Sequence, residues 1–297
     1  MYPFFSVVIP TYNRADLILE TLNTVFTQTY PHFEIIVVDN CSTDNTEELL
    51  LPLHDKGKII YIRHERNFER GKSRNTGMSN AKGDFLTFLD SDDFMSDNCL
   101  QDAADYIVAH PAKKVFQNKY DLVNDRREQI YAFPFPPLDN QYLALCSGNF
   151  ISCIGGFIHR EIYTKVRFNE DPKMVGSEDY EVWFDVLAGY TMGRIDRVNC
   201  SIREHPNRSV HNGVYENLAY QKAYLLKKIS KDPILFDKFG KYSNRLNASF
   251  LLQQAIVLKQ LKQDFKALNM LILAVWTDFS IISTRRFFGV TYNIIKK

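Results

Sequence analysis

The fold class is decided by residues 4–39, which read FFSVVIPTYNRADLILETLNTVFTQTYPHFEIIVVD. The apolar run that ends before Pro10 predicts a strand, and apolar residues at helical spacing over 17–26 predict a helix. Residues 33–38 form a second apolar, β-branched run and predict a second strand. This stretch therefore predicts a strand, a helix and a strand in succession.

The alternation of strands and helices continues along the chain. Residues 59–62 and 85–89 are two further strand candidates, and residues 71–81 are the helix between them. Strands that alternate with helices imply right-handed crossovers and a Rossmann-like, mostly parallel α/β sheet flanked by helices. Ligands of such sheets bind outside the carboxyl ends of the strands. Asp39 and Asp90 each follow a strand, so we expect both on that rim.

The composition is that of an ordinary folded enzyme. The chain has 297 residues, of which 45% are hydrophobic and 24% charged, and this excludes disordered, collagen-like and polytopic membrane proteins. A net charge of +1 provides no general field for nucleic acid, so no nucleic-acid partner is expected. The five cysteines form no C-x-x-C pair and the start lacks signal-peptide features, which indicates reduced thiols in a cytoplasmic protein.

The chain divides into three regions, residues 1–110, 111–212 and 213–297. The second region contains a strand near Val115 and a strong helix pattern over residues 178–188. The third region contains helical patterns and no strand signal of equal strength, so it predicts a C-terminal helical extension of the sheet domain.

Three carboxylates follow the strand at residues 85–89, in the sequence Asp90-Ser91-Asp92-Asp93. Crowded carboxylates repel one another unless a cation holds them, and oxygen ligands suit a hard divalent ion, Mg²⁺ or Mn²⁺. The alternative is a solvated turn before a helix capped at Ser96 or Asp97. Asp39 at a neighbouring strand end favours a ligand site over the solvated turn.

Basic residues surround the start of the helix at residues 71–81. A phosphate-binding P-loop is excluded because Arg66 stands where its first glycine is required, and no G-x-G-x-x-G follows any strand. Arg70, Lys72 and Arg74 remain as candidates to hold an anion at the helix start, and the alternative is a solvated basic turn.

Two polar segments lie further along the chain. Glu178 and Asp179 open a helix, where a carboxylate either favours the helix dipole or acts as a general base. Residues 203–209 contain several donors that suit phosphate, among them Arg203 and Arg208. His205 in this segment is either a surface histidine or a ligand.

Taken together, these segments resemble the inverting nucleotide-sugar glycosyltransferases of family 2, which have the A-type glycosyltransferase fold. The resemblance runs from Val7 to about Ser209. It is carried by four segments in order: Val7-Val-Ile-Pro-Thr-Tyr-Asn-Arg14, Ile36-Val-Val-Asp-Asn-Cys-Ser-Thr-Asp44, Gly71-Lys-Ser-Arg-Asn-Thr-Gly77 and Asp90-Ser-Asp-Asp93.

The resemblance implies a role for each matching residue. The implied nucleotide-sugar-binding residues are Pro10, Thr11, Tyr12, Arg14, Asp39, Gly71, Arg74, Asp90 and Ser91. Asp92 is the implied ligand of a Mn²⁺ or Mg²⁺ ion, with Asp90 and His205 beside it. Arg203 and Arg208 would bind the diphosphate. Asp179 is the implied catalytic base, with Glu178 as the second candidate.

The resemblance also implies the reaction. Residues 1–110 would bind the nucleotide sugar and residues 111–212 the acceptor. A base activates an acceptor hydroxyl for direct displacement with inversion, while a cation stabilises the leaving diphosphate. We expect transfer of a hexose from a UDP-sugar to a saccharide or lipid-linked saccharide in cell-surface polysaccharide biosynthesis, such as O-antigen or capsule.

Two departures keep alternatives open. Asn40 stands where many family members have a second Asp, and Ser73 stands where Ala is usual. A dTDP-rhamnose-dependent transferase is one alternative, and a catalytically inactive sugar-nucleotide-binding or scaffold protein is another. A sugar nucleotidyltransferase is disfavoured because residues 10–14 contain no glycine.

The C-terminal region lies outside the resemblance. Residues 244–282 have one long helical pattern, whose apolar part, 268–282, is shorter than the ~20 residues that a membrane crossing needs. Residues 255–297 hold seven Lys or Arg and two Asp, a net charge of +5. This basic, aromatic region either lies on an anionic inner membrane surface or packs on the catalytic domain or a dimer partner, which leaves a peripheral location and a homodimer open.

Overall fold

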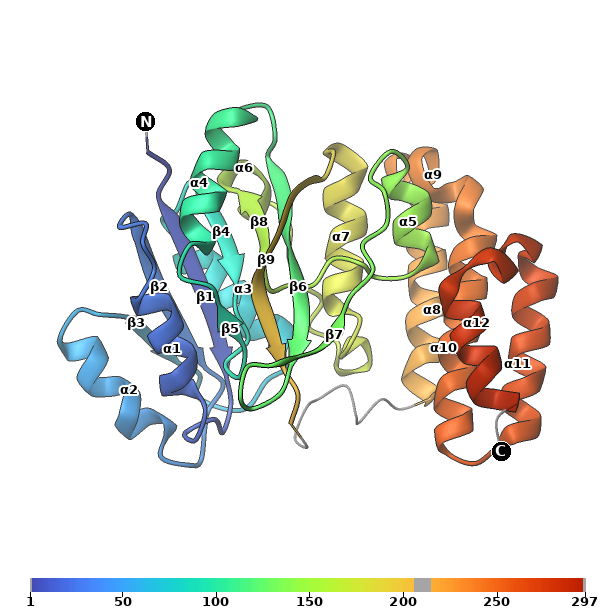
Figure 1. The fold of residues 1–297 in the computed structure, drawn as a ribbon, viewed down its shortest axis with the longest axis horizontal. Helices are drawn as coiled ribbons and strands as arrows, with labels where there is room; N and C mark the ends of the chain where they lie inside the picture. The colour runs from blue at the N-terminus through green and yellow to red at the C-terminus, as the bar shows by residue number, and fades with distance from the viewer. Residues whose placement is uncertain (1, 206–214, 296–297) are drawn as a thin grey trace. The chain divides into compact units, whose positions relative to one another are not determined.

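A computed structural model describes residues 2–205 and 215–295, without the side chains of residues 215, 216, 293 and 295. The chain forms two compact units (Figure 1). The first consists of the described parts of residues 1–135, 151–172 and 189–206. The second consists of the described parts of residues 136–150, 173–188 and 207–297.

The first unit is built on one mixed sheet, whose strand order is β3-β2-β1-β4-β8-β6-β9-β5, with β7 paired to β6. The strands are β1 (Phe5–Thr11), β2 (Phe33–Asp39), β3 (Ile60–Arg63), β4 (Phe85–Phe88), β5 (Phe94–Met95), β6 (Val115–Val123), β7 (Gln129–Ala132), β8 (Gly156–His159) and β9 (Gly193–Arg203). The strands β1 to β4 are parallel to one another, and β8 enters antiparallel between β4 and β6. The predicted α/β fold class is confirmed.

Strand β1 runs two residues further than predicted, through Pro10 to Thr11. The carbonyl of Val8 accepts from the amide of Leu89, so the even-numbered residues of β1 direct their backbone groups towards β4. The pairing with β4 stops at Val8, so the missing N–H of Pro10 interrupts no ladder bond. The strand can therefore end at Thr11, beside Asp39 of β2.

Helices cover both faces of this sheet. They are α1 (Ile18–Phe26), α2 (Thr46–Asp55), α3 (Arg70–Asn80), α4 (Cys99–Ala109) and α6 (Arg160–Tyr163). The helices α1 and α4 pack with Phe5, Val7 and Ile9 of β1 in one apolar core. Helix α3 lies on the other face, so close to β1 that a Cβ added at Gly77 would overlap the side chain of Val8.

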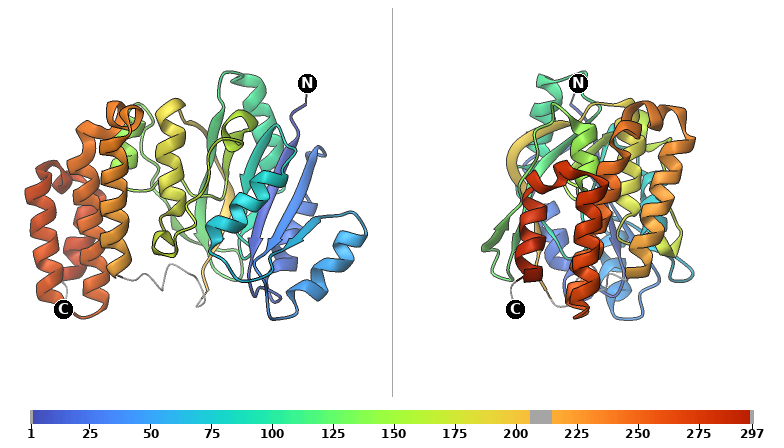
Figure 2. Two further views of the ribbon diagram at one scale, coloured as in Figure 1. Left: turned by 180° about the vertical axis from the view of Figure 1, so that it is seen from behind. Right: turned by 90° about the vertical axis from the view of Figure 1, so that its right-hand side faces the viewer.

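The second unit is helical. Its elements are α5 (Gln141–Ser147), η1 (Pro172–Met174), α7 (Glu178–Gly189), α8 (Tyr215–Lys231), α9 (Pro233–Phe239), η3 (Gly240–Tyr242), α10 (Ser243–Gln260), α11 (Asp264–Thr277), η4 (Phe279–Ser283) and α12 (Arg285–Ile295). Helix α10 is the central helix and packs against α5, α8, α11 and α12 (Figure 2). The predicted C-terminal helical extension is confirmed.

The long helical pattern over residues 244–282 is not one helix. A tight turn separates α10 from α11, and Lys262 in this turn has a φ of 57°. The turn folds α11 back on α10, so that Ala255, Leu271 and Ala274 share one apolar cluster. No described helix is both long enough and apolar enough to cross a membrane. All five cysteines are free thiols.

Candidate active site

The carboxyl ends of β1, β2 and β4 meet at one rim of the sheet, as the sequence predicts. Asp39 ends β2 beside Thr11, and its carboxylate is fully buried. One oxygen accepts from the backbone N–H and the hydroxyl of Ser42, at 2.8 and 2.6 Å, and the other accepts from the hydroxyl of Tyr61 at 2.7 Å. Burial and the bond to Asp39 raise the pKa of Tyr61, so Tyr61 remains a protonated donor.

The three carboxylates after β4 have three separate sets of partners. Asp90 accepts from the guanidinium of Arg74 at 3.1 Å. Asp92 faces Arg14 Nε at 3.2 Å and His205 Nε2 at 3.0 Å. Asp93 is buried and accepts from the backbone N–H of residue 203 in β9, at 2.9 Å. The three therefore do not form a solvated turn, and Asp93 fastens the loop to β9.

The predicted metal ligands are brought together only in part. Asp92 and His205 are neighbours, and a carboxylate with an imidazole suits Mn²⁺. Asp90 is paired with Arg74 instead. Within residues 2–205 and 215–295 no group of three or more His, Cys, Asp or Glu side chains could hold a metal ion. The pair Asp92 and His205 supplies donor atoms that suit a divalent ion, and Asp92 is also paired with Arg14.

The loop after β1 is tied to the loop after β2. Asn13 adopts a φ of 49°, its N–H donates to the Ser42 hydroxyl at 2.9 Å, and its side-chain oxygen accepts from the N–H of Thr43 at 2.8 Å. These bonds set the position of Arg14 next to Asp92. Of the other predicted residues here, Thr11 is buried, Pro10 is half-buried and Tyr12 is 40% exposed.

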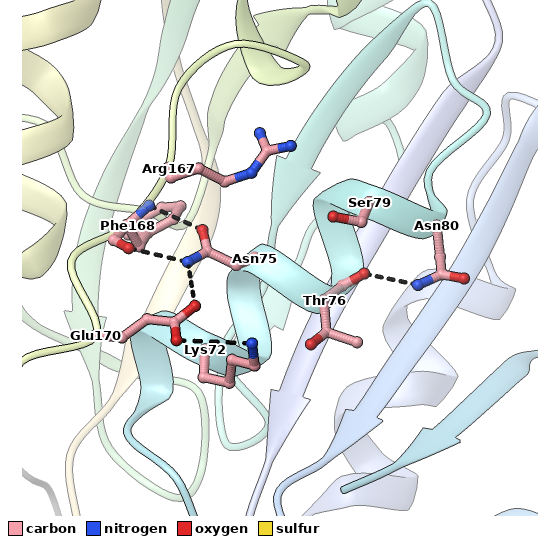
Figure 3. Close-up of a pocket in the computed structure, with 8 residues that line it drawn as sticks. All are labelled: Lys72, Asn75, Thr76, Ser79, Asn80, Arg167, Phe168 and Glu170. Atoms are coloured by element: carbon pink, nitrogen blue, oxygen red, sulfur yellow. Dashed lines mark hydrogen bonds and ion pairs between the residues drawn. The ribbon is translucent and has the colours of Figure 1, made fainter.

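Helix α3 directs its polar residues to two sides. Arg74 is buried and contacts Asp90 and the ring of Phe168. Lys72 faces Glu170 at 3.6 Å, on a pocket of about 470 Å³ (Figure 3). Gly71 lies against the backbone of Asn169, where a Cβ would overlap the carbonyl oxygen. Gly71 is therefore required for close packing, whatever its role towards a ligand.

Asn75, which sequence reasoning did not select, holds α3 to the segment after α6. Its side-chain oxygen accepts from the N–H of Phe168 at 2.8 Å, and its amide donates to the carbonyl of Phe168 and to Glu170, both at 2.9 Å (Figure 3). The sequence feature that could have indicated Asn75 is its position next to Arg74 in the segment 71–77, which resembles the family. The asparagine fixes the helix that carries Arg74.

Asn40 and His64 form a second unforeseen cluster. The Asn40 amide donates to the side chain of Asn67 and the carbonyl of Phe68, and its oxygen accepts from the N–H of Phe68 at 2.9 Å. His64 lies between Asn40 Oδ1, at 3.0 Å, and the hydroxyl of Thr76, at 2.9 Å. Burial lowers the pKa of His64. Asn40, which stands where many family members have Asp, thus cross-links the end of β2 to residues 67 and 68.

Of the two predicted diphosphate residues, only Arg203 is described, and its side chain is paired elsewhere than with Asp92. The Arg203 guanidinium contacts Asp125 and Glu20, each at 2.8 Å, and is 12% exposed. Arg208 lies outside the described residues, as does Ser209. Ser91 is buried in the loop after β4.

The two base candidates belong to the second unit and differ in their surroundings. Glu178 is 3% exposed and accepts from the N–H of Gly176 at 2.6 Å, which ties down the start of α7. Asp179 is half-buried. Its carboxylate accepts from the side-chain amide of Asn149 at 3.1 Å and from the N–H of Tyr180 at 2.7 Å. Of the two, Asp179 is the more open to a ligand.

Comparison with known proteins identifies the family. The profile described as "Glycosyl transferase family 2" matches residues 6–166, more than half of the chain. The protein belongs to glycosyl transferase family 2. The family resemblance is thereby confirmed, and the protein is a glycosyltransferase. Asp179 and His205 lie beyond the matched residues.

Three relatives have described activities. The putative teichuronic acid biosynthesis glycosyltransferase TuaG of Bacillus subtilis is 28% identical over 193 residues, 64% of this chain and 74% of TuaG. The UDP-Glc:alpha-D-GlcNAc-diphosphoundecaprenol beta-1,3-glucosyltransferase WfgD of Escherichia coli is 28% identical over 66% of this chain and 73% of WfgD. The poly(ribitol-phosphate) beta-N-acetylglucosaminyltransferase TarS of Staphylococcus aureus is 40% identical over 36% of this chain and 19% of TarS.

Solved structures show the same fold. Residues 1–349 of S. aureus TarS, in complex with UDP-GlcNAc, superpose with a TM-score of 0.70 at 22% identity, covering 98% of this chain and 87% of that one. The mannosyltransferase PcManGT of Pyrobaculum calidifontis, in complex with GDP-Man and Mn²⁺, has a TM-score of 0.63 at 20% identity and covers 99% and 84%. The fold is the A-type glycosyltransferase fold.

Proposed function

We propose that the protein is an inverting glycosyltransferase that moves a hexose from a UDP-sugar to a saccharide hydroxyl in the assembly of a cell-surface polysaccharide. The observation that carries this proposal is the rim where Asp39, Arg14 and Asp92 follow neighbouring parallel strands, all within the residues that match the family. The name of WfgD gives UDP-Glc, and the TarS structure is a complex with UDP-GlcNAc, and both support uridine.

Asp39 is proposed to receive the nucleoside. A carboxylate accepts about four hydrogen bonds, and Asp39 accepts three from Ser42 and Tyr61. The oxygen that faces Tyr61 also lies 3.9 Å from Arg63 Nε. Because Asp39 is fully buried, an N–H or O–H of the nucleoside would take the remaining lone pair only when a side chain that covers this oxygen moves aside.

Asp92 and His205 are proposed to hold a Mn²⁺ or Mg²⁺ ion beside the donor diphosphate. The ion supplies positive charge for the diphosphate that leaves in the reaction. Arg14 is paired with Asp92 and Arg74 with Asp90 at this rim. When a ligand is bound, the two guanidinium groups would also donate hydrogen bonds to its phosphate oxygens.

Asp179 is proposed as the base that takes the proton of the attacking acceptor hydroxyl. Asn149 holds one oxygen of this carboxylate, and the helix backbone holds the other. The acceptor oxygen then displaces the nucleoside diphosphate directly, and no covalent intermediate with the enzyme is required. Glu178 is bound to the turn at Gly176 and is proposed as structural.

The test is turnover with a donor panel of UDP-glucose, UDP-GlcNAc, dTDP-rhamnose and GDP-mannose, first with water as acceptor and then with saccharides. We expect one UDP-sugar to be consumed. Asp179→Asn should lower kcat by about 10²–10⁴-fold with little change in donor KM, because it removes only proton transfer. Asp196→Asn, at an exposed carboxylate paired with Lys119, is the control.

Three results would contradict the proposal. Unchanged turnover in Asp179→Asn would remove the base assignment. Consumption of dTDP-rhamnose alone would establish the alternative donor, and consumption of no donor by a protein that binds nucleotide would establish the inactive binding protein.

A further inference from the structure

The outward side of helix α11 carries mainly apolar side chains, interrupted by the half-buried Asn269. Five large side chains on it are 41–84% exposed: Phe265, Leu268, Ile272, Leu273 and Trp276. The opposite side of the helix is also apolar, but Ala267, Leu271 and Ala274 are buried in the cluster with α10. A helix on the surface of a protein in water normally has polar residues on its outward side. We call the five exposed residues the α11 face.

The elements on either side of α11 also have exposed apolar side chains. Leu261 in the turn before α11 is 55% exposed, and Phe279 directly after it is 72% exposed. Helix α12, which packs against α11 (Figure 1), adds Phe288 and Tyr292, 64% and 60% exposed. Arg285 is exposed on the same side of α12, three and seven residues before these rings.

The charges beside the α11 face are mostly positive. Lys262 and Lys266 are exposed on either side of Phe265. The two acidic residues of this region are paired: Asp264 with Lys259 at 3.0 Å, and Asp278 with Arg245 at 2.8 Å. Lys262 and Lys266 therefore make the charge of the described residues beside this face predominantly positive.

We propose that the α11 face docks on the surface of an anionic lipid bilayer, with the helix lying in the plane of the interface. Phe and Leu enter the boundary of headgroups and acyl chains, Trp276 and Tyr292 suit the headgroup level, and the lysines meet anionic headgroups. A helix of 14 residues is about 21 Å long, so it can lie on a bilayer and not cross it.

Lipid is favoured over a second copy of this chain by the kind of residues present. The centres of protein interfaces are depleted in lysine, and an exposed aromatic surface bordered by lysines is instead typical of interfacial helices. The inference concerns residues outside the family match and does not rest on the proposed function.

The test is sedimentation of the full chain with vesicles of phosphatidylcholine alone or of equimolar phosphatidylcholine and phosphatidylglycerol. We expect binding to the anionic vesicles, weakened by salt because exposed charges are screened. The chain has two tryptophans, and Trp183 is buried, so a blue shift of the emission on binding reports Trp276. Trp276→Phe should abolish that shift while the protein still sediments.

Paired substitutions separate the two contributions. Phe265→Ser with Trp276→Ser, and separately Lys262→Glu with Lys266→Glu, should each weaken vesicle binding about tenfold or more. The matched control is Ile234→Ser with Phe236→Ser, two residues of α9 that are 63% and 58% exposed. This control should bind as the wild type does.

Three outcomes would overturn the proposal. The first is no sedimentation of the wild type with anionic vesicles, and the second is an equal loss in the α9 control. The third is a wild-type dimer, measured by analytical ultracentrifugation, that Phe265→Ser with Trp276→Ser converts to a monomer without any lipid binding. That result would assign the α11 face to a second copy of the chain.

Discussion

Asp39, Asp92 and Asp93 have the same functional group and three different surroundings. Asp93 accepts from a backbone N–H of β9 and is structural. Asp39 is fixed by Ser42 and Tyr61, and Asp92 faces two cationic or ligating side chains, Arg14 and His205. The sequence places these carboxylates at strand ends but does not distinguish them, because the distinction depends on partners that are far away in the chain.

At the residue scale, Asn75→Ala should destabilise the protein. The change leaves the buried N–H and carbonyl of Phe168 without their partner, and such groups cost about 1–3 kcal/mol each when unpaired. The measurement is the free energy of unfolding in urea. Asn80→Ala is the control, because Asn80 is exposed and bonds only within its own helix, to Thr76 at 2.9 Å. Equal losses in the two variants would contradict the account of α3.

The surroundings of His64 predict a dependence of stability on pH. Burial lowers the pKa of His64 below 6.5, so the folded protein holds the neutral ring while the unfolded chain takes up a proton near 6.5. Between the two values the unfolded state binds more protons, and the free energy of unfolding therefore falls as the pH falls. His64→Gln should reduce this loss between about pH 8 and about pH 5, measured by urea unfolding. A variant with the same pH slope as the wild type would show that His64 does not contribute.

At the scale of elements, the first four strands could be predicted, whereas β5, β7, β8 and β9 and the ends of several elements could not. The alternation of apolar runs locates β1 to β4 and the helices between them, because period and length differ between the two kinds of element. The extension of β1 through Pro10 follows from where β4 stops, and the break at Lys262 lies in a stretch without Gly or Pro. Tertiary pairing decides both, and local sequence carries no signal for either.

The close approach of α3 to β1 makes a further prediction. In Gly77→Ala the new methyl group overlaps Val8, so the free energy of unfolding should fall by about 1–3 kcal/mol. Gly189→Ala, at the end of α7 where nothing lies within 4 Å of an added Cβ, should be neutral or stabilising. In the double variant Gly77→Ala with Val8→Ala the costs should not add, because the smaller side chain relieves the overlap. Additive costs would contradict the packing described for α3.

At the scale of the whole molecule, the family match explains the rim of the sheet, and the C-terminal helices have to be explained from their own residues. The family match covers residues 6–166, which include the rim with Asp39 and Asp92. The helices α8–α12 lie outside it, and their exposed aromatic surface is interpreted from burial and charge alone. The strand pattern and the rim carboxylates do not distinguish one sugar from another, so the expected UDP-sugar donor and saccharide acceptor rest on the family resemblance.

The most direct measurement of the central claim is the shift in thermal midpoint caused by UDP with Mn²⁺, in the wild type, Asp92→Asn and Asp105→Asn. A ligand that binds only the folded state raises the midpoint. We predict a shift for the wild type and for Asp105→Asn, whose exposed carboxylate lies on α4, and its loss in Asp92→Asn. An equal shift in Asp92→Asn, or no shift with any nucleoside diphosphate in the wild type, would contradict the account.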